Sequence, residues 1–85
     1  MTSKPDGRHF RAARAWLRLS KEQTAFGAEI APATVARLEL DDPKALPASR
    51  DKLARFFASR GVDFLFFPAG SGIYVENGEQ SPDAT

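Results

Sequence analysis

Few residues in this 85-residue chain could carry out chemistry. It has one histidine, His9, and no cysteine, which excludes thiolate metal sites and cysteine nucleophiles. With no cluster of carboxylates near it, His9 is expected to be an exposed residue at the start of a helix. Ser20 is interpreted as a helix cap, since no base is placed to activate its hydroxyl. We therefore expect no enzymatic activity, no catalytic or metal-binding residue and no cofactor.

Basic side chains are concentrated in the first half of the chain. Residues 1–38 carry seven basic and three acidic side chains, whereas residues 39–85 carry five basic and eight acidic ones. A local basic face governs binding to a polyanion more than the formal net charge of +1 does. Arg11 and Arg18 could contact phosphate, but a solvated helix face explains their spacing equally well, so charge alone leaves both interpretations open.

The composition is that of one small globular domain, with 42% hydrophobic and 27% charged residues. We expect neither a signal peptide nor a membrane span, because no apolar run is long enough. The absence of cysteine fits a reducing compartment, so we expect a cytoplasmic, nucleoid-associated protein with no membrane partner.

Apolar spacing, caps and turn residues predict a mostly α fold of four helices followed by a short C-terminal β-hairpin. Gln23, three residues after Ser20, completes a capping box for the second helix, and Pro32 is well placed at the start of the third. Gly61 is expected to end the fourth helix with a positive φ. The predicted helices cover residues 8–19, 21–28, 32–39 and from Ala48 or Ser49 to 60.

After these helices the pattern becomes β-rich. Residues 62–67 and 73–76 are expected to form two strands joined by a five-residue loop, Pro68–Gly72. The polar ends of the chain indicate a flexible tail over residues 1–7 and a disordered tail over residues 77–85.

Two short helices joined by a three-residue turn are typical of a helix-turn-helix. The stretches RAARAWLRLS at 11–20, KEQTA at 21–25 and ATVARLE at 33–39 resemble the Cro/lambda-repressor-type (XRE family) regulators over about residues 8–61. The resemblance implies a lambda-repressor-like domain that binds double-stranded DNA. It also implies that the third helix lies in the major groove, where its outward face reaches base edges.

The same resemblance implies a role for particular residues. Arg37 is the residue suited to a bidentate contact with guanine. Arg14 and Glu39 match a largely buried ion pair that joins the first helix to the end of the third. The complete expected DNA-binding set is Lys21, Ala31, Pro32, Ala33, Thr34, Arg37 and Lys44.

Several residues depart from the family pattern. Glu29 occupies a turn position where glycine is preferred, and Thr24 replaces a larger apolar residue, for which Phe26 is expected to compensate in the core. Ala31, Pro32 and Ala33 offer no side-chain donors for reading bases, and Asp41 and Asp42 would repel a nearby phosphate path. An alternative therefore stays open, in which the domain is an antitoxin-like or co-regulator module that binds a protein through its aromatic C-terminal segment.

The C-terminal segment is aromatic on both predicted faces. Alternation places Phe64 and Phe66 on one face and Leu65 and Phe67 on the other. One face is expected to pack on the fourth helix and the other on a second copy of the chain, because an isolated hairpin is marginally stable. Trp16 is expected in the core or in an interface. The expected homodimer interface, within residues 62–76, is Phe64, Leu65, Phe66, Phe67, Ile73, Tyr74 and Val75.

Overall fold

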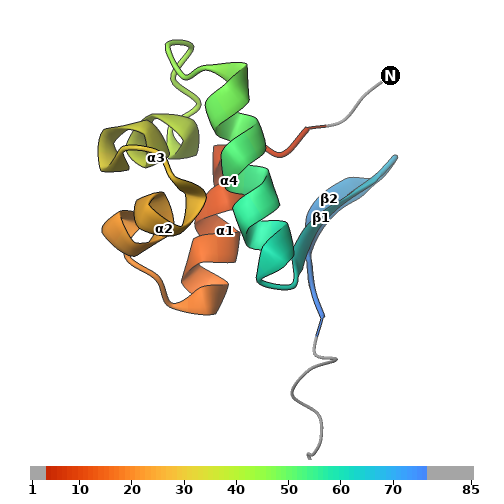
Figure 1. The fold of residues 1–85 in the computed structure, drawn as a ribbon. Helices are drawn as coiled ribbons and strands as arrows, with labels where there is room; N and C mark the ends of the chain where they lie inside the picture. The colour runs from red at the N-terminus through yellow and green to blue at the C-terminus, as the bar shows by residue number, and fades with distance from the viewer. Residues whose placement is uncertain (1–3, 77–85) are drawn as a thin grey trace, which may run out of the picture.

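The computed structural model describes residues 4–76. In this part of the chain, four helices are followed by one antiparallel hairpin, as the sequence predicts (Figure 1). The expected disordered tail, residues 77–85, lies outside the described residues. The elements are α1 (Gly7–Leu17), α2 (Lys21–Ala28), α3 (Pro32–Glu39), α4 (Pro47–Ser59), β1 (Val62–Phe67) and β2 (Gly70–Val75).

Helix α1 starts one residue earlier than expected because Asp6 caps it. The Asp6 side chain accepts a hydrogen bond from the backbone N–H of Arg8, and the ring of His9 accepts one from the backbone N–H of Asp6. This reciprocal arrangement satisfies N–H groups that the first turn of a helix leaves free. The expected loose tail of residues 1–7 therefore does not extend to Asp6 and Gly7. At its other end, α1 stops at Leu17 because Arg18 adopts the left-handed conformation, with φ of 58°.

Helices α2 and α3 have the predicted bounds. Ser20 Oγ accepts from the N–H of Gln23 at 2.9 Å, and Gln23 Oε1 accepts from the N–H of Ser20 at 2.8 Å. Glu29 ends α2 in the left-handed conformation, with φ of 62° and ψ of 45°. A residue with a Cβ pays about 1–2 kcal/mol for this conformation. The turn therefore keeps the backbone path that glycine favours, without a glycine.

Helix α4 starts at Pro47, before the expected Ala48 or Ser49, because proline occupies its first position. It ends at Ser59, and Gly61 follows with φ of 83°, the positive value that the sequence predicts.

The hairpin loop is shorter than expected. β1 and β2 pair from Val62–Val75 to Phe67–Gly70, so only Pro68 and Ala69 form the turn. The prediction of a five-residue loop was wrong because it treated two glycines as loop formers. Gly70 and Gly72 are instead extended strand residues that lie opposite Phe67 and Leu65.

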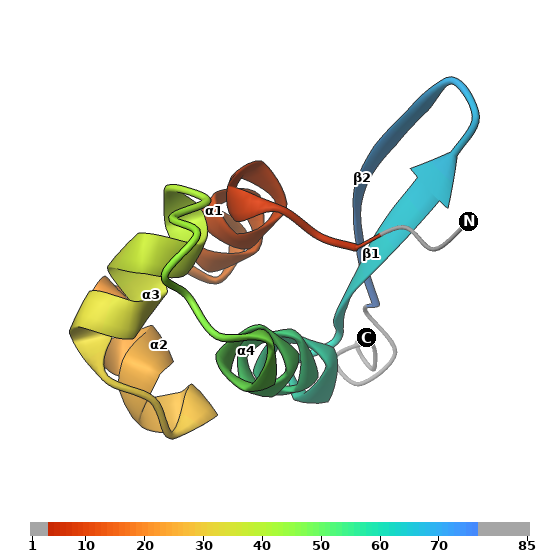
Figure 2. The ribbon, with the colours of Figure 1, turned by 90° about the horizontal axis from the view of Figure 1, so that it is seen from above.

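The core lies where α1, α3, α4 and one face of the hairpin meet (Figure 2). Phe57 is fully buried between two aromatic neighbours, with ring centroids 6.3 Å from Phe10 and 6.2 Å from Phe64. Figure 2 shows β2 on the side of α1 and β1 on the side of α4. The hairpin thus closes one side of the helical unit instead of standing apart from it.

One aromatic residue expected in the core, and another expected in the core or in an interface, are both exposed. Phe26 is 88% exposed, so it does not compensate for Thr24, which is itself fully buried. Thr24 fits this site because its hydroxyl donates to the backbone carbonyl of Ser20 at 2.9 Å. Trp16 is 61% exposed and is no part of the core.

Candidate nucleic-acid interface

Helix α3 packs through one face and presents the other to solvent. Val35 and Leu38 are fully buried against the rest of the domain. Ala33, Arg37 and Leu40 are exposed, and their spacing of four and three residues places them on one opposite face. The turn at residues 29–31 holds α3 beside α2, on the side of the molecule away from the hairpin (Figure 1). This exposed face is the candidate interface.

The end of α3 is fixed to α1 by the expected ion pair. Arg14 Nε lies 2.6 Å from Glu39 Oε2, and Arg14 Nη2 lies 3.0 Å from Oε1, so the contact is bidentate. The Glu39 side chain is 3% exposed, and Arg14 also donates to the carbonyl of Leu19 at 3.2 Å. The hydrogen bonds that Arg14 donates to the Glu39 carboxylate raise the pKa of Arg14 above its ordinary value. This pair sets the angle at which α3 leaves the scaffold.

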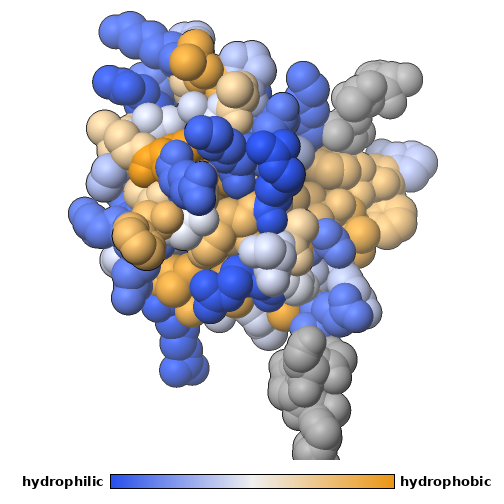
Figure 3. Space-filling view, in the orientation of Figure 1, coloured by the Kyte–Doolittle hydropathy of each residue, from blue (hydrophilic) through white to orange (hydrophobic). Residues whose placement is uncertain are grey.

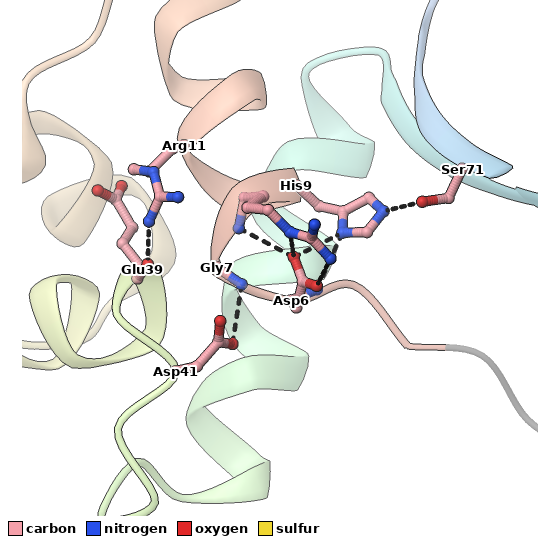
Figure 4. A network of polar contacts seen from close by, with 8 residues as sticks. Asp6, Gly7, His9, Arg11, Glu39, Asp41 and Ser71 are labelled. Atoms are coloured by element: carbon pink, nitrogen blue, oxygen red, sulfur yellow. Dashed lines mark hydrogen bonds and ion pairs between the residues drawn. The ribbon is translucent and has the colours of Figure 1, made fainter.

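Further contacts fasten the same end of α3 to the start of α1 (Figure 4). Arg11 donates to the carbonyl of Glu39, so this arginine is engaged within the domain. The N–H of Gly7 donates to Asp41 Oδ1 at 2.9 Å. A Cβ at Gly7 would overlap the carbonyl oxygen of Glu39, so only glycine fits at this crossing.

The residues expected to bind DNA are at or near the surface. Lys21 is exposed at the start of α2, Thr34 is half-buried in α3, and Lys44 is exposed in the loop after α3. The loop lies at the upper end of the view in Figure 1, continuing from α3. The other members of the set lie on the exposed side of α3 or at its start: Ala31, Pro32, Ala33 and Arg37.

The two aspartates after α3 are already used within the domain. Asp41 adopts φ of 57° and directs its carboxylate to the N–H of Gly7, at the positive end of α1. Asp42 accepts from the N–H of Lys44 at 2.8 Å. Both carboxylates therefore have internal partners, which weakens their expected repulsion of a phosphate backbone.

The chemistry that this face offers is mostly non-polar. Ala31 makes no side-chain hydrogen bond to cap α3, and Pro32 follows it without an N–H. Arg37 supplies the guanidinium fork, whereas Ala33 and Leu40 supply methyl surface. Phe26 on the neighbouring helix α2 is also exposed, whereas the sequence predicted it in the core. The face can therefore form one strong polar contact within a largely apolar contact area.

The seven residues expected in a dimer interface are divided between two faces of the hairpin. Phe64, Phe66, Ile73 and Val75 are partly buried, and their strand positions place them on the face that packs on the domain's own helices. Leu65, Phe67 and Tyr74 are 37%, 64% and 53% exposed on the opposite face. Figure 3 shows apolar surface over the hairpin, at the right of the view. Only these three side chains remain free for another molecule.

A polar network that the sequence did not predict links the start of α1 to the hairpin. His9 is 8% exposed, not exposed as expected, and its Nε2 lies 2.9 Å from Ser71 Oγ (Figure 4). His9 Nδ1 lies 3.0 Å from the backbone nitrogen of Asp6 and 3.0 Å from Asp6 Oδ1, so the imidazole ring joins the cap of α1 to Ser71 on the hairpin. Hydrogen bonds from Arg8 hold the pKa of Asp6 well below its ordinary value of 3.8. Histidine three residues after a capping aspartate was the available signal.

Residues 4–76 show neither a metal-binding cluster nor a membrane-spanning helix. No three histidine, cysteine or acidic side chains there are grouped so that they could hold a metal ion. None of the helices in this range has the length and apolar character needed to cross a membrane.

Comparison with known proteins adds no family to this description. No protein-family model matches the chain, and no curated protein matches it either.

Proposed function

We propose that this protein is a sequence-specific double-stranded DNA-binding regulator that acts as a homodimer. The observation that carries the proposal is the exposed face of α3, held by the Arg14–Glu39 pair and presenting Arg37 to solvent. The major groove of B-DNA, about 12 Å wide, admits one such helix. Arg37 would donate both arms of its fork to guanine O6 and N7, while the methyl group of Ala33 would contact the methyl group of a thymine.

Backbone phosphates would be bound around this helix. Lys21 and Lys44 are exposed cations on either side of α3 in the sequence, and the hydroxyl of Thr34 is a neutral donor close to its start. Such contacts position the protein on the duplex without reading its sequence. In this proposal the protein is associated with the nucleoid and represses transcription by covering a promoter.

Two copies would read a palindrome, because a homodimer related by a two-fold axis presents two copies of α3. The half-sites of such an operator lie about 34–36 Å apart, or one helical turn. Linking two modest contacts raises the affinity of each through effective concentration. Dimerisation would thus supply the affinity that a single α3 face, with few polar groups, lacks.

Replacing Arg37 with alanine tests the placement of α3. Arg37→Ala should weaken binding to the selected operator by about 1–3 kcal/mol, equivalent to roughly 5–150-fold in Kd, because the bidentate contact is lost. Arg37 is exposed, so the thermal unfolding temperature should not change. The operator is first selected from random DNA, and Kd is then measured by fluorescence anisotropy.

A matched control is Arg55→Ala, which removes an exposed arginine from α4. It should leave operator affinity within about twofold of the parent, apart from a weak long-range charge effect. Equal losses in the two variants would contradict the assignment of base reading to α3.

Phosphate binding is tested by salt dependence. Lys21→Ala should lower affinity for operator and random DNA alike, and should reduce the slope of log K against log salt by about 1. The measurement is a Kd series between 50 and 200 mM salt, two concentrations that bracket the physiological range. An unchanged slope would remove Lys21 from the interface.

A second candidate function is recognition of a protein. The exposed side chains of Phe26 (88%) and Leu40 (76%) favour it, because a DNA backbone makes little use of them. In that case the chain is an antitoxin-like or co-regulator module with a protein partner. Affinity that stays constant as salt rises, with no DNA enriched by selection, would favour this second function over the first.

A further inference from the structure

Strand β2 has an open edge. The N–H of Glu76 donates to the carbonyl of Gly61 at 2.8 Å, so these two residues form a hydrogen-bonded pair. Pairs in an antiparallel ladder alternate between hydrogen-bonded and non-hydrogen-bonded. The backbone groups of Ser71, Ile73 and Val75 therefore point away from β1. Among residues 4–76, no backbone hydrogen bond outside the hairpin ladder engages these three residues.

This edge lacks the features that prevent strands from pairing. The segment Gly70–Val75 contains no proline and no charged side chain, and its register with β1 contains no bulge. Protected edges usually carry lysine, proline or a bulge. The edge of β2 therefore carries unpaired backbone groups with which another strand can form hydrogen bonds.

We propose that β2 pairs antiparallel with β2 of a second copy, with Ile73 on the two-fold axis. The inference rests on the homodimer of the proposed function and supplies its geometry. In this register Ile73 pairs with its own counterpart, and Ser71 pairs with Val75 of the second copy. All the outward-pointing backbone groups of β2 are then hydrogen-bonded. Centring the axis on Ser71 or on Val75 would leave some of them without a partner.

The outer face of the sheet supports this register. Gly72 lies opposite Tyr74 of the second copy, in a non-hydrogen-bonded pair where side chains approach most closely. A Cβ at Gly72 would meet no atom within 4 Å, so the space above it is open. Leu65 lies across from Gly72 in the same chain. The exposed ring of the second copy's Tyr74 would cross this gap and cover Leu65, as aromatic side chains do over cross-strand glycines.

The inner face offers a matching cavity. A cavity of about 460 Å³ lies between α1 and β2, lined by Arg8, His9, Ala12, Gly70, Ser71, Gly72 and Ile73. Ser71 turns its side chain toward α1, where it meets His9. Side chains of directly paired residues project from the same face of a sheet. Val75 of the second copy, opposite Ser71, would therefore lie beside this cavity while it stays packed on its own subunit's core.

The decisive variant is Gly72→Lys. The isolated subunit has room for this side chain, but the pairing places Tyr74 of the second copy in the same space. We expect the dimer dissociation constant, measured by sedimentation equilibrium without DNA, to rise by about tenfold or more. The matched control is Gly70→Lys, which adds the same charge to the same open face but next to Glu76 of the second copy, so it should not raise the constant. Circular dichroism checks that both variants keep the fold.

Disulfide cross-linking tests the register directly, because the chain has no cysteine of its own. Residues in a non-hydrogen-bonded pair have Cα atoms about 4.5 Å apart, within the range that a disulfide spans. Mixing Gly72→Cys with Tyr74→Cys and oxidising should give more mixed dimer than either variant alone, and more than Gly70→Cys mixed with Tyr74→Cys.

The outcomes separate this inference from the proposed function. A stable dimer whose mass and cross-links are indifferent to Gly72→Lys overturns the pairing of β2 and leaves a homodimer through another surface. A parent protein that stays monomeric overturns both the pairing and the homodimer. Neither result bears on the proposed DNA binding by α3. That binding is tested separately by measuring the affinity of Arg37→Ala for a single half-site.

Discussion

Among individual residues, Arg14 and Glu39 have the largest structural role. Their bidentate contact lies between α1 and the last turn of α3, with the Glu39 side chain 3% exposed. Two charges taken out of water stabilise a fold only when each has its partner, and removing one leaves the other buried and uncompensated. The orientation of α3 therefore depends on a pair that lies apart from its exposed face.

We expect Arg14→Met to destabilise the domain by about 3–5 kcal/mol, because Glu39 would keep a buried charge without a counterion. The double variant Arg14→Met with Glu39→Leu should recover much of this loss. The measurement is urea unfolding of the parent, both single variants and the double variant, analysed as a double-mutant cycle. If the two single effects simply add in the double variant, the residues are not coupled as the structure indicates.

For single residues, the sequence predicted some side-chain contacts and missed others. The Arg14–Glu39 pair followed from a motif, because both residues occupy positions where the resembling family has the pair. The contact of His9 with the Asp6 cap had a local signal, but the burial of His9 had none, because its partner Ser71 is 62 residues away and lies in a segment that was expected to be a loop. The exposure of Phe26 was not predicted either. Thr24 was expected to leave space in the core, but it is fully buried because its hydroxyl donates to the carbonyl of Ser20.

Among the elements, helix boundaries were predictable where local chemistry sets them. Ser20 with Gln23 and Pro32 at a first position fixed two helix starts, and Gly61 fixed one end. The start of α1 was placed one residue late because its capping box uses histidine in place of the usual glutamate or glutamine. The hairpin turn was misjudged because glycine favours loops in isolation, whereas pairing with β1 extends it here.

The Asp6 cap of α1 makes the free energy of unfolding depend on pH in the acidic range. The pKa of Asp6 is lowered in the folded state, chiefly by hydrogen bonds from Arg8, relative to an ordinary value of 3.8. The ionised carboxylate therefore stabilises the fold above about pH 3.8, and this contribution is lost as the pH falls below that value toward the lowered pKa. Asp6→Asn should show a smaller drop in unfolding free energy between pH 5 and pH 2 than the parent, measured by urea unfolding. Equal pH dependence in both proteins would rule out this role for Asp6.

For the whole molecule, the small size of the chain makes a partner useful. A domain of this length buries only about 60–65% of the surface of its unfolded chain. The inner side chains of the hairpin are already occupied by the domain's own helices, and the outer ones are left to solvent. The sequence predicted the alternation of the two faces, but it could not show which of them the helices would cover.

This division of the hairpin into a covered and an exposed face predicts different effects on thermal stability for two neighbouring phenylalanines. Phe66→Asp should lower the thermal unfolding temperature by several degrees, because Phe66 packs against His9, with ring centroids 5.2 Å apart. Phe67→Asp should leave that temperature nearly unchanged, since Phe67 is 64% exposed. Calorimetry measures both effects. A loss of stability in Phe67→Asp that equals that of Phe66→Asp would show that both faces are covered within one subunit.

The crossing at Gly7 has a consequence for how the molecule meets any target. The main chain at the start of α1 touches the main chain at the end of α3, with no side chain between them to yield. Together with the bonds from Arg11 and to Asp41, this fastens the end of α3 to the start of α1. We therefore expect the domain to meet a target with little change in its own shape, so that the target supplies the adaptation. For a duplex, that means preference for sequences whose groove width and bendability match a fixed shape.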